Sequence, residues 1–243
     1  MHLRKKILLV NNVVWNETYP IKHPLKDVTA WFKKALEPLG RFCLRTISPE
    51  SASLSLHFEQ ADAIILSGSP RNAWENDVAT LHLLEVLKEY VAKDKPILGI
   101  CYGHQILARA FKGEVQRNPQ GWEVGPVSIT LTPEGKASSL FHNMPETFSV
   151  IQSHRDIVTH LPSQAVLLAK GEQNLNQAFQ IGKTAFGVQF HPEMNRSLLN
   201  FLWAPRLAEE QTKSSFNISE RIKQTPNISP NREIMLNFVR NFT

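Results

Sequence analysis

The chain has 243 residues, of which 42% are apolar and 20% are charged, the balance of an ordinary globular protein. Its net charge of +5 comes from scattered basic residues without a dense patch, so the composition does not predict nucleic-acid binding. With only Cys43 and Cys101, a disulfide framework is excluded, and no run of about 20 apolar residues predicts a membrane span. The apolar run Ile7–Val10 is too short for a signal peptide, so we expect a cytoplasmic protein.

Strands and helices alternate along the first half of the chain. Ile7–Asn11 is a continuous apolar run, the pattern of a strand buried on both faces, and the apolar spacing over Val28–Leu39 predicts a helix. Further strands are expected at Phe42–Ile47, Ala63–Leu66 and Pro96–Cys101, and further helices at Leu81–Val91 and Gly103–Phe111. This order predicts parallel β-α-β units with helices on both faces of the sheet, whose reactive groups gather where strands end.

From about Glu114 the expected strands become shorter, and helices close the chain. Strands are expected at Val124–Leu131, Phe148–Ile151, Ala165–Ala169, Ala178–Ile181 and Ala185–Phe190, and helices at Arg196–Glu210 and Arg232–Phe242. Residues 211–230 are polar and contain two prolines, which favours a loose insert or flap. We therefore expect a single domain over residues 1–243, with a core at 7–193 and a helical C-terminal extension at 194–243.

The segment Gly99-Ile100-Cys101-Tyr102-Gly103 lies between an expected strand and an expected helix. The pattern G-x-C-x-G is typical of a nucleophile elbow, because glycines give room for a tight turn. The sulfur then stands at the start of a helix, where backbone N–H groups favour the thiolate. A buried cysteine that merely packs is the alternative, and the flanking glycines favour function. Cys43 has no such flanks and is expected in the core.

A thiolate nucleophile needs a base that can also protonate the departing amine. His191 follows the last buried strand, and in an extended segment Glu193 would face the same side and reach its ring. A carboxylate there orients the imidazole and stabilises its charged form. The sequence therefore indicates a catalytic triad of Cys101, His191 and Glu193.

Stabilisation of the oxyanion requires backbone N–H donors near the nucleophile. The N–H of Tyr102 is one candidate, and the turn at Gly68 is the other, because glycine permits close approach of the backbone. An ordinary β-to-α turn at Gly68 is the alternative. The tryptophans Trp122 and Trp203, like Trp74, either shape a pocket or pack. No Gly-rich phosphate loop and no cysteine–histidine cluster with zinc spacing occurs, so neither a metal nor another cofactor is expected.

Several segments together resemble class I glutamine amidotransferases over most of residues 7–193. They are GICYGHQ, QFHPE and SGSP, while Ser153-His154-Arg155-Asp156 and Asn176-Gln177-Ala178-Phe179 most resemble the amidotransferase domain of GMP synthetase and its stand-alone relatives. The resemblance implies a three-layer, flavodoxin-like α/β fold: a mostly parallel central sheet, helices on both faces and a small antiparallel sheet. It also implies that the cysteine attacks the glutamine side-chain amide, and that the substrate's amino-acid end is held by Gln105, Ser153, His154, Arg155 and Asp156.

Two residues depart from the family pattern. Related chains usually have glycine where Arg155 stands and often where Ser67 stands. Arg155 either binds a carboxylate of a substrate larger than glutamine, by a charge-assisted pair, or is simply solvated.

Three functions remain open on the sequence. The first is hydrolysis of glutamine to glutamate and ammonia, with ammonia passed to an acceptor on a separate synthetase subunit, since residues 194–243 are too few for an ATP-dependent domain. The second is a stand-alone hydrolase of γ-glutamyl peptides or conjugates, which a flap at 211–230 would favour. The third is a redox-sensing cysteine protein, a role that needs no His-x-Glu pair.

Overall fold

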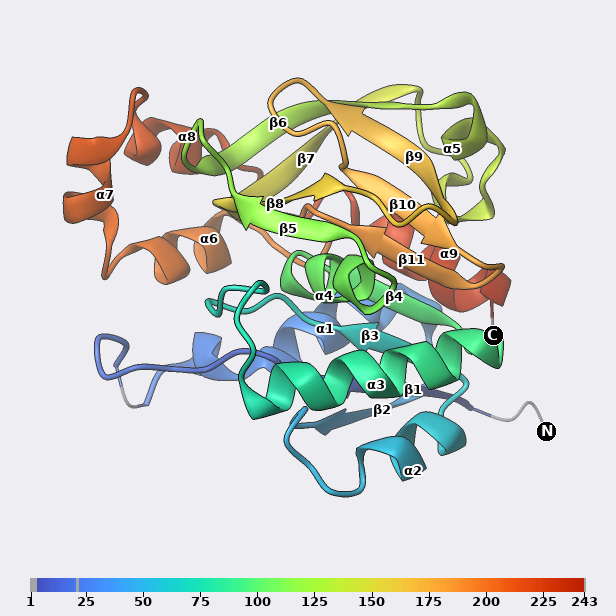
Figure 1. Ribbon diagram of the computed structural model, residues 1–243. Coiled ribbons are helices and arrows are strands. Elements are labelled where there is room, and N and C mark those ends of the chain that lie inside the picture. The colour runs from blue at the N-terminus through green and yellow to red at the C-terminus, as the bar shows by residue number, and fades with distance from the viewer. Residues whose placement is uncertain (1–3, 21, 243) are drawn as a thin grey trace.

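The structure, a computed structural model that describes residues 4–20 and 22–242, is built on a nine-stranded sheet (Figure 1). The strand order is β2-β1-β3-β4-β11-β10-β9-β6-β7; the first five strands in this order run parallel and the others antiparallel. Strands β5 and β8 form the small antiparallel sheet. The strands are β1 (Lys5–Val10), β2 (Phe42–Ile47), β3 (Ala63–Leu66), β4 (Ile97–Ile100), β5 (Glu114–Arg117), β6 (Glu123–Leu131), β7 (Thr147–His154), β8 (Asp156–His160), β9 (Ala165–Gly171), β10 (Ala178–Ile181) and β11 (Ala185–Val188).

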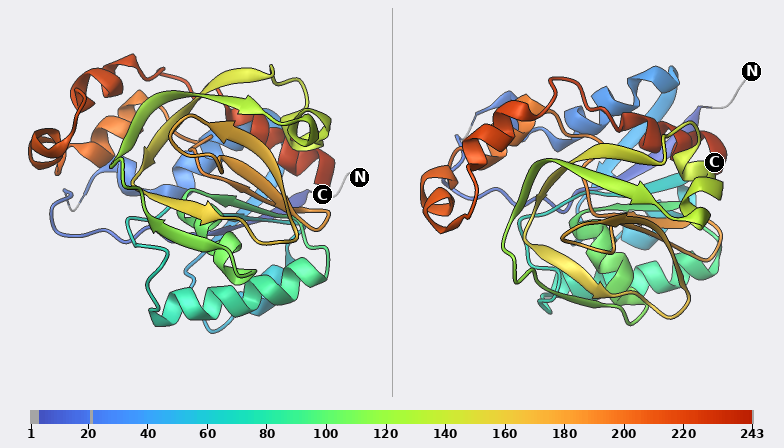
Figure 2. Two further views of the ribbon diagram at one scale, coloured as in Figure 1. Left: turned by 45° about the horizontal axis from the view of Figure 1, so that its top comes forward. Right: turned by 90° about the horizontal axis from the view of Figure 1, so that it is seen from above.

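Helices cover both faces of the parallel strands, which confirms the expected three-layer α/β fold (Figure 2). The helices are α1 (Val28–Leu36), α2 (Leu54–Gln60), α3 (Val78–Ala92), α4 (Tyr102–Ala110), α5 (Pro133–Ala137), α6 (Arg196–Trp203), α7 (Leu207–Lys213), α8 (Ile218–Gln224) and α9 (Arg232–Phe242), with short 3₁₀ helices at Pro24–Lys26, Glu37–Leu39 and Ser139–Phe141. Within the described residues, none of these helices has the length and apolar character needed to cross a bilayer.

Successive side chains of the central strands pack alternately into two hydrophobic clusters, one on each face of the sheet. Leu9 of β1 packs in the cluster covered by α1 and α9, whereas Leu8 and Val10 pack in the cluster covered by α2, α3 and α4. This two-sided burial follows from the period of two along a strand, and it explains why the parallel strands are continuous apolar runs.

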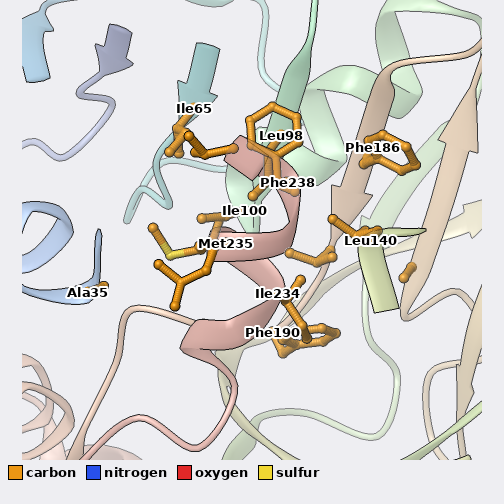
Figure 3. Close-up of a cluster of buried hydrophobic side chains, with 14 of the residues drawn as sticks. Ala35, Ile65, Leu98, Ile100, Leu140, Phe186, Phe190, Ile234, Met235 and Phe238 are labelled. Carbon is orange, nitrogen blue, oxygen red and sulfur yellow. The ribbon is translucent and has the colours of Figure 1, made fainter. Parts of the chain in front are cut away.

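Helix α9 brings the end of the chain back onto the parallel strands. Figure 3 shows Met235 and Phe238 of α9 lying among Ile65, Leu98 and Ile100 of the central strands. The closing helix predicted at Arg232–Phe242 is thus confirmed, and it seals the face opposite α3 and α4.

The strand register brings the carboxyl ends of three parallel strands to one edge of the sheet. Leu66 of β3 lies opposite Gly99 of β4, and Val188 of β11 lies opposite Ile100 of β4. The segments that follow these strands therefore leave the sheet together, and Cys101 leaves with them.

The expectation of a core position for Cys43 is wrong. Cys43 is exposed on β2, which is an edge strand whose successive side chains alternate between half-buried and exposed. The apolar character of the segment did not reveal that its sheet ends there.

The loose insert expected at residues 211–230 is also wrong, because much of it is helical. The side chain of Asn217 caps α8 by accepting a hydrogen bond from the Glu220 N–H at 3.0 Å. Ile218 and Ile222 of α8 are buried in a third hydrophobic cluster, which also contains residues of β6, β7, α6 and the segment around Tyr19. The single helix expected at 196–210 is interrupted after Trp203, at a segment that contains Pro205, and resumes as α7.

Four short elements, α2, α5, β5 and β8, were not predicted. Each is short and, unlike the four-residue strand β3, is not a continuous apolar run, so it gives no clear pattern in the sequence.

Truncation of a core side chain in α9 should destabilise the protein strongly. We expect Phe238→Ala to lower the free energy of unfolding by about 3–5 kcal/mol, because the ring is fully buried and its loss leaves a cavity. Arg240→Ala on the exposed face of the same helix removes only a surface ion pair with Glu233 and should cost less than about 1 kcal/mol. Guanidinium-induced unfolding measures both, and equal losses would contradict the packing assigned to α9.

Candidate active site

Cys101 occupies a strained turn between β4 and α4. Its backbone has φ +52° and ψ −102°, a conformation that residues with a side chain rarely adopt. A Cβ added at Gly99 would lie 2.4 Å from the Gly103 carbonyl oxygen, and one added at Gly103 would lie 2.6 Å from Leu66 Cβ. Both glycines are thus required for the turn, and the tight strand-to-helix elbow predicted from the sequence is present.

His191 and Glu193 form a buried pair beside the elbow. The His191 Nδ1 and the Glu193 Oε1 are 2.7 Å apart, and the two residues are only 6% and 7% exposed. The expected contact is confirmed, although the chain reaches it by a turn rather than by an extended segment: the Met194 N–H donates to the His191 carbonyl at 3.3 Å. The hydroxyl of Ser229 donates to the carbonyl of Pro192 and holds this turn from the C-terminal side.

Two buried histidines near the elbow differ in charge. Burial alone lowers the pKa of His191, but the negative charges of Glu193 and of the Cys101 thiolate, and hydrogen bonds to both groups, raise that pKa to about 10. Burial lowers the pKa of His104 to about 3, so its ring stays neutral behind Phe179. The environment therefore supports an imidazolium at His191, next to the sulfur, and a neutral ring at His104.

The turn after β3 brings Gly68 against the same two side chains. A Cβ at Gly68 would lie 2.8 Å from His191 Cε1 and 3.6 Å from Cys101 Cβ, so only glycine fits without displacing the imidazole. The hydroxyl of Ser67 donates to the Gly68 carbonyl at 2.9 Å and accepts from the Asn12 N–H at 2.9 Å. Serine at position 67 thus fixes the turn by its side chain.

A cleft of about 220 Å³ opens beside these groups. Cys101, His191 and the turn at Gly68 lie along it, and segment 153–156 forms another part of its lining. The segment 11–20 and helices α6 and α7 add the outer walls, and Figures 1 and 2 show these two parts of the chain projecting on the same side of the sheet. The structure therefore gathers all the residues nominated from the sequence around one cleft, except Tyr102, whose side chain is buried behind it against Thr80.

The floor of the cleft is made of side chains that already have partners. The Gln105 Nε2 donates to the Asp156 carbonyl at 2.7 Å, and the Asp156 carboxylate pairs with Arg117 at 3.1 Å. Burial raises the pKa of Asp156, and the charges of Arg117 and Arg155 oppose that rise. The buried ring of His154 lies 3.0 Å from the Glu123 carboxylate and 3.1 Å from the Asp156 carbonyl. The side chains of the floor are thus held by contacts within the protein.

Arg155 lies at the rim rather than the floor. Its guanidinium stands 5.3 Å from the centre of the Trp122 ring, and Arg206 stands 5.6 Å from the same ring. Trp122 lines the cleft, and the fully buried Trp203 packs edge to face against it at 4.9 Å between ring centres.

Sequence reasoning missed Glu123, Arg206 and Glu210. No local pattern marks them, since each acquires its partner only through tertiary contacts. Among the described residues, no group of three or more histidine, cysteine, aspartate or glutamate side chains is arranged to hold a metal ion.

The charge of Glu193 should be measurable through the titration of His191. We expect the ring to titrate near pH 10 in the wild-type protein and about one to three pH units lower in Glu193→Gln, because the amide removes the main charge that stabilises the imidazolium. NMR of labelled histidine between pH 6 and 11 measures this directly. Glu210→Gln, a carboxylate of the same cleft bonded to Trp122, is the control and should leave the titration unchanged.

The same pair makes stability depend on pH. Because the folded pKa exceeds the unfolded value of about 6.5, the stabilisation is complete below that pH and is lost as the pH rises through 10. In Glu193→Gln the loss should occur at lower pH, and an identical pH profile of the unfolding midpoint would contradict the assigned pair.

Comparisons with known proteins agree with this architecture. A family model described as "Glutamine amidotransferase class-I" matches residues 26–200. Gamma-glutamyl peptidase 3 of Arabidopsis thaliana is 35% identical over 144 residues, 58% of this chain and 58% of that protein. The glutamine-hydrolyzing GMP synthase of Thermosipho melanesiensis is 34% identical over 182 residues, 72% of this chain and 33% of the synthase. A crystal structure of a glutamine amidotransferase from Thermotoga maritima shares the fold with a TM-score of 0.77 at 21% identity, over 99% of both chains.

The chain spans little more than half the length of the plant relative and about a third of the synthase. The family model, in contrast, matches more than half of the chain, in the part that carries the elbow and the histidine–glutamate pair. The chain belongs to the class I glutamine amidotransferase family.

Proposed function

We propose that this protein hydrolyses a γ-glutamyl amide with Cys101 as nucleophile, His191 as acid and base, and Glu193 as the group that orients the imidazole. One observation carries the proposal: a cysteine held at positive φ at the start of α4 stands beside a buried histidine–glutamate pair. A helix start favours the thiolate, and the raised pKa of His191 favours the imidazolium that must accompany it.

In the first half of the reaction, the Cys101 thiolate adds to the γ-carbonyl carbon and the carbonyl oxygen becomes an oxyanion. Because Nδ1 of His191 faces Glu193, the proton on Nε2 is the one delivered to the departing nitrogen. The carbon–nitrogen bond then breaks, the amine or ammonia leaves, and a γ-glutamyl thioester remains on the sulfur.

In the second half, the now neutral Nε2 of His191 takes a proton from water, and the resulting hydroxide adds to the thioester carbonyl. Collapse of this intermediate releases glutamate and returns the thiolate beside an imidazolium. The backbone N–H groups of Tyr102 and Gly68 are our candidates for stabilising both oxyanions, since both residues flank the sulfur.

Two substrate classes fit this reaction. Relatives named as GMP synthases support glutamine as substrate, with ammonia passed to a separate synthetase subunit. The relative named as a γ-glutamyl peptidase supports a γ-glutamyl peptide. The outer cleft favours the peptide, because ammonia as the leaving group would make no use of a wall that contains Trp15, Trp31 and Trp122.

The proposal predicts a cysteine-bound thioester that a nucleophile can intercept. With glutamine or a γ-glutamyl dipeptide, we expect the wild-type protein to release glutamate and, in hydroxylamine, to form the γ-glutamyl hydroxamate. Cys101→Ala should lose at least about a thousandfold in rate, because removal of a triad nucleophile leaves only binding and oxyanion stabilisation. Mass spectrometry detects the hydroxamate.

The matched control is Cys43→Ala, which removes the other, exposed thiol and should retain full activity. Glutamate release that survives in Cys101→Ala would reject the mechanism. Oxidation of Cys101 without hydroxamate formation from any of these compounds would favour the redox-sensing alternative.

A methyl group at position 68 should impair chemistry more than folding. In Gly68→Ala the new Cβ would meet His191 Cε1 at 2.8 Å, so the imidazole must shift. We expect kcat to fall about a hundredfold, the cost of roughly 1 Å of misplacement, with little change in the unfolding midpoint. Steady-state kinetics and thermal unfolding of the same preparation measure the two quantities, and an unaltered kcat would show that Gly68 does not constrain the histidine.

A further inference from the structure

The outer cleft has a charged, aromatic rim formed by Trp122, Arg155 and Arg206. The other lining residues of the cleft include Trp15 and Trp31. A γ-glutamyl group is small and polar, so it has no use for this much aromatic surface. The three tryptophans are half-buried against the third hydrophobic cluster, and the parts of them that line the cleft are available to another part of the ligand.

The tryptophan of the rim is held firmly in place. The Trp122 Nε1 donates to the Glu210 Oε2 at 2.8 Å, and its ring packs edge to face with the fully buried Trp203. Trp203 in turn donates to the Ser153 hydroxyl at 3.0 Å. Helices α6 and α7 thus fix the indole as a platform next to segment 153–156.

The other arginines of the cleft already have oxygen partners. Arg206 donates to the Leu202 carbonyl at 3.0 Å and to the Tyr19 hydroxyl at 3.1 Å. Arg71 pairs with Glu50 at 2.8 Å and with Asp77 at 3.4 Å. These guanidinium groups therefore have structural roles.

Arg155 differs from them. Over residues 4–20 and 22–242, no carboxylate lies within 4.0 Å of its guanidinium and no acceptor bonds to it, while its neighbour Asp156 is paired with Arg117. The guanidinium lies over the Trp122 ring and lines the cleft. A planar cation held on an aromatic face, with its N–H edge free, is preorganised for a carboxylate.

Resting on the proposed function, we propose that Arg155 and Trp122 form a subsite for the amine component that the reaction releases, and that this component is an amino acid or peptide with a free carboxylate. Trp122 would contact its apolar part and Arg155 its carboxylate. Arg155 contacts Trp122, whereas the neighbouring Asp156 bonds to Gln105 through its carbonyl and to Arg117 through its carboxylate.

A pair of substrates that differ only in this charge tests the subsite. The probes are γ-glutamyl-phenylalanine and its carboxamide, γ-glutamyl-phenylalaninamide, with glutamine as a substrate whose leaving group has no carboxylate. In the wild-type protein we expect kcat/KM to be about 10- to 100-fold higher for the acid than for the carboxamide, the usual effect of a charge-assisted pair. Arg155→Gln should reduce this ratio to about one, because the group that pairs with the carboxylate is lost.

Two variants control for indirect effects. Arg71→Gln removes a paired arginine of the same cleft and should keep the acid-to-carboxamide ratio. Arg155→Lys keeps the positive charge but loses the planar guanidinium, so it should retain part of the preference for the acid over the carboxamide. If thermal unfolding shows that Arg155→Gln does not fold, Arg155→Lys takes its place in the test.

The outcomes separate the subsite from the reaction. An equal loss for glutamine and both dipeptides in Arg155→Gln would place the arginine at the glutamyl carboxylate and overturn the subsite. A wild-type protein that shows no preference for the acid, or whose preference survives in Arg155→Gln, would overturn it too while leaving the hydrolysis intact. If no γ-glutamyl compound releases glutamate, the proposed function fails, and the subsite fails with it.

Discussion

The backbone pairing of β4 with β11 is the constraint on which the site depends. The Cys101 N–H donates to the Val188 carbonyl at 2.9 Å, and beyond β11 the His191 N–H donates to the Ile151 carbonyl at 2.9 Å. These bonds fix two chain segments, far apart in sequence, at one edge of the sheet. A slip of one residue in this pairing would turn Cys101 to the opposite face, so the register of β4 and β11 decides whether the sulfur faces the cleft.

The parts that the sequence predicts well are those in which local pattern and tertiary role coincide. Parallel strands appear as apolar runs because both of their faces are covered. The elbow can be predicted from the sequence because it requires glycine at two positions. At Gly99 and Gly103 a single extra carbon would collide with the backbone or with Leu66. The contact of His191 with Glu193 follows from their closeness in sequence, even though the intervening backbone turns rather than extends.

The parts that escaped prediction owe their position to distant partners. Glu123 carries no local pattern, and it meets His154 only because the register of β6 and β7 places the two residues opposite each other. Helix α8 lies in a polar stretch. Its few apolar residues become buried only because they pack in the third hydrophobic cluster. Arg206 likewise depends on Trp122, which arrives from another part of the chain. Single-sequence periodicity contains none of this information.

The third hydrophobic cluster ties the outer wall of the cleft to the central sheet. It joins the segment around Tyr19 to α6 and α8, and it includes Val124 of β6 and Ile151 of β7. The carbonyl of the same Ile151 accepts the hydrogen bond from the His191 N–H. Because a close-packed interior transmits strain, a shift of the wall would reach the backbone that positions the histidine.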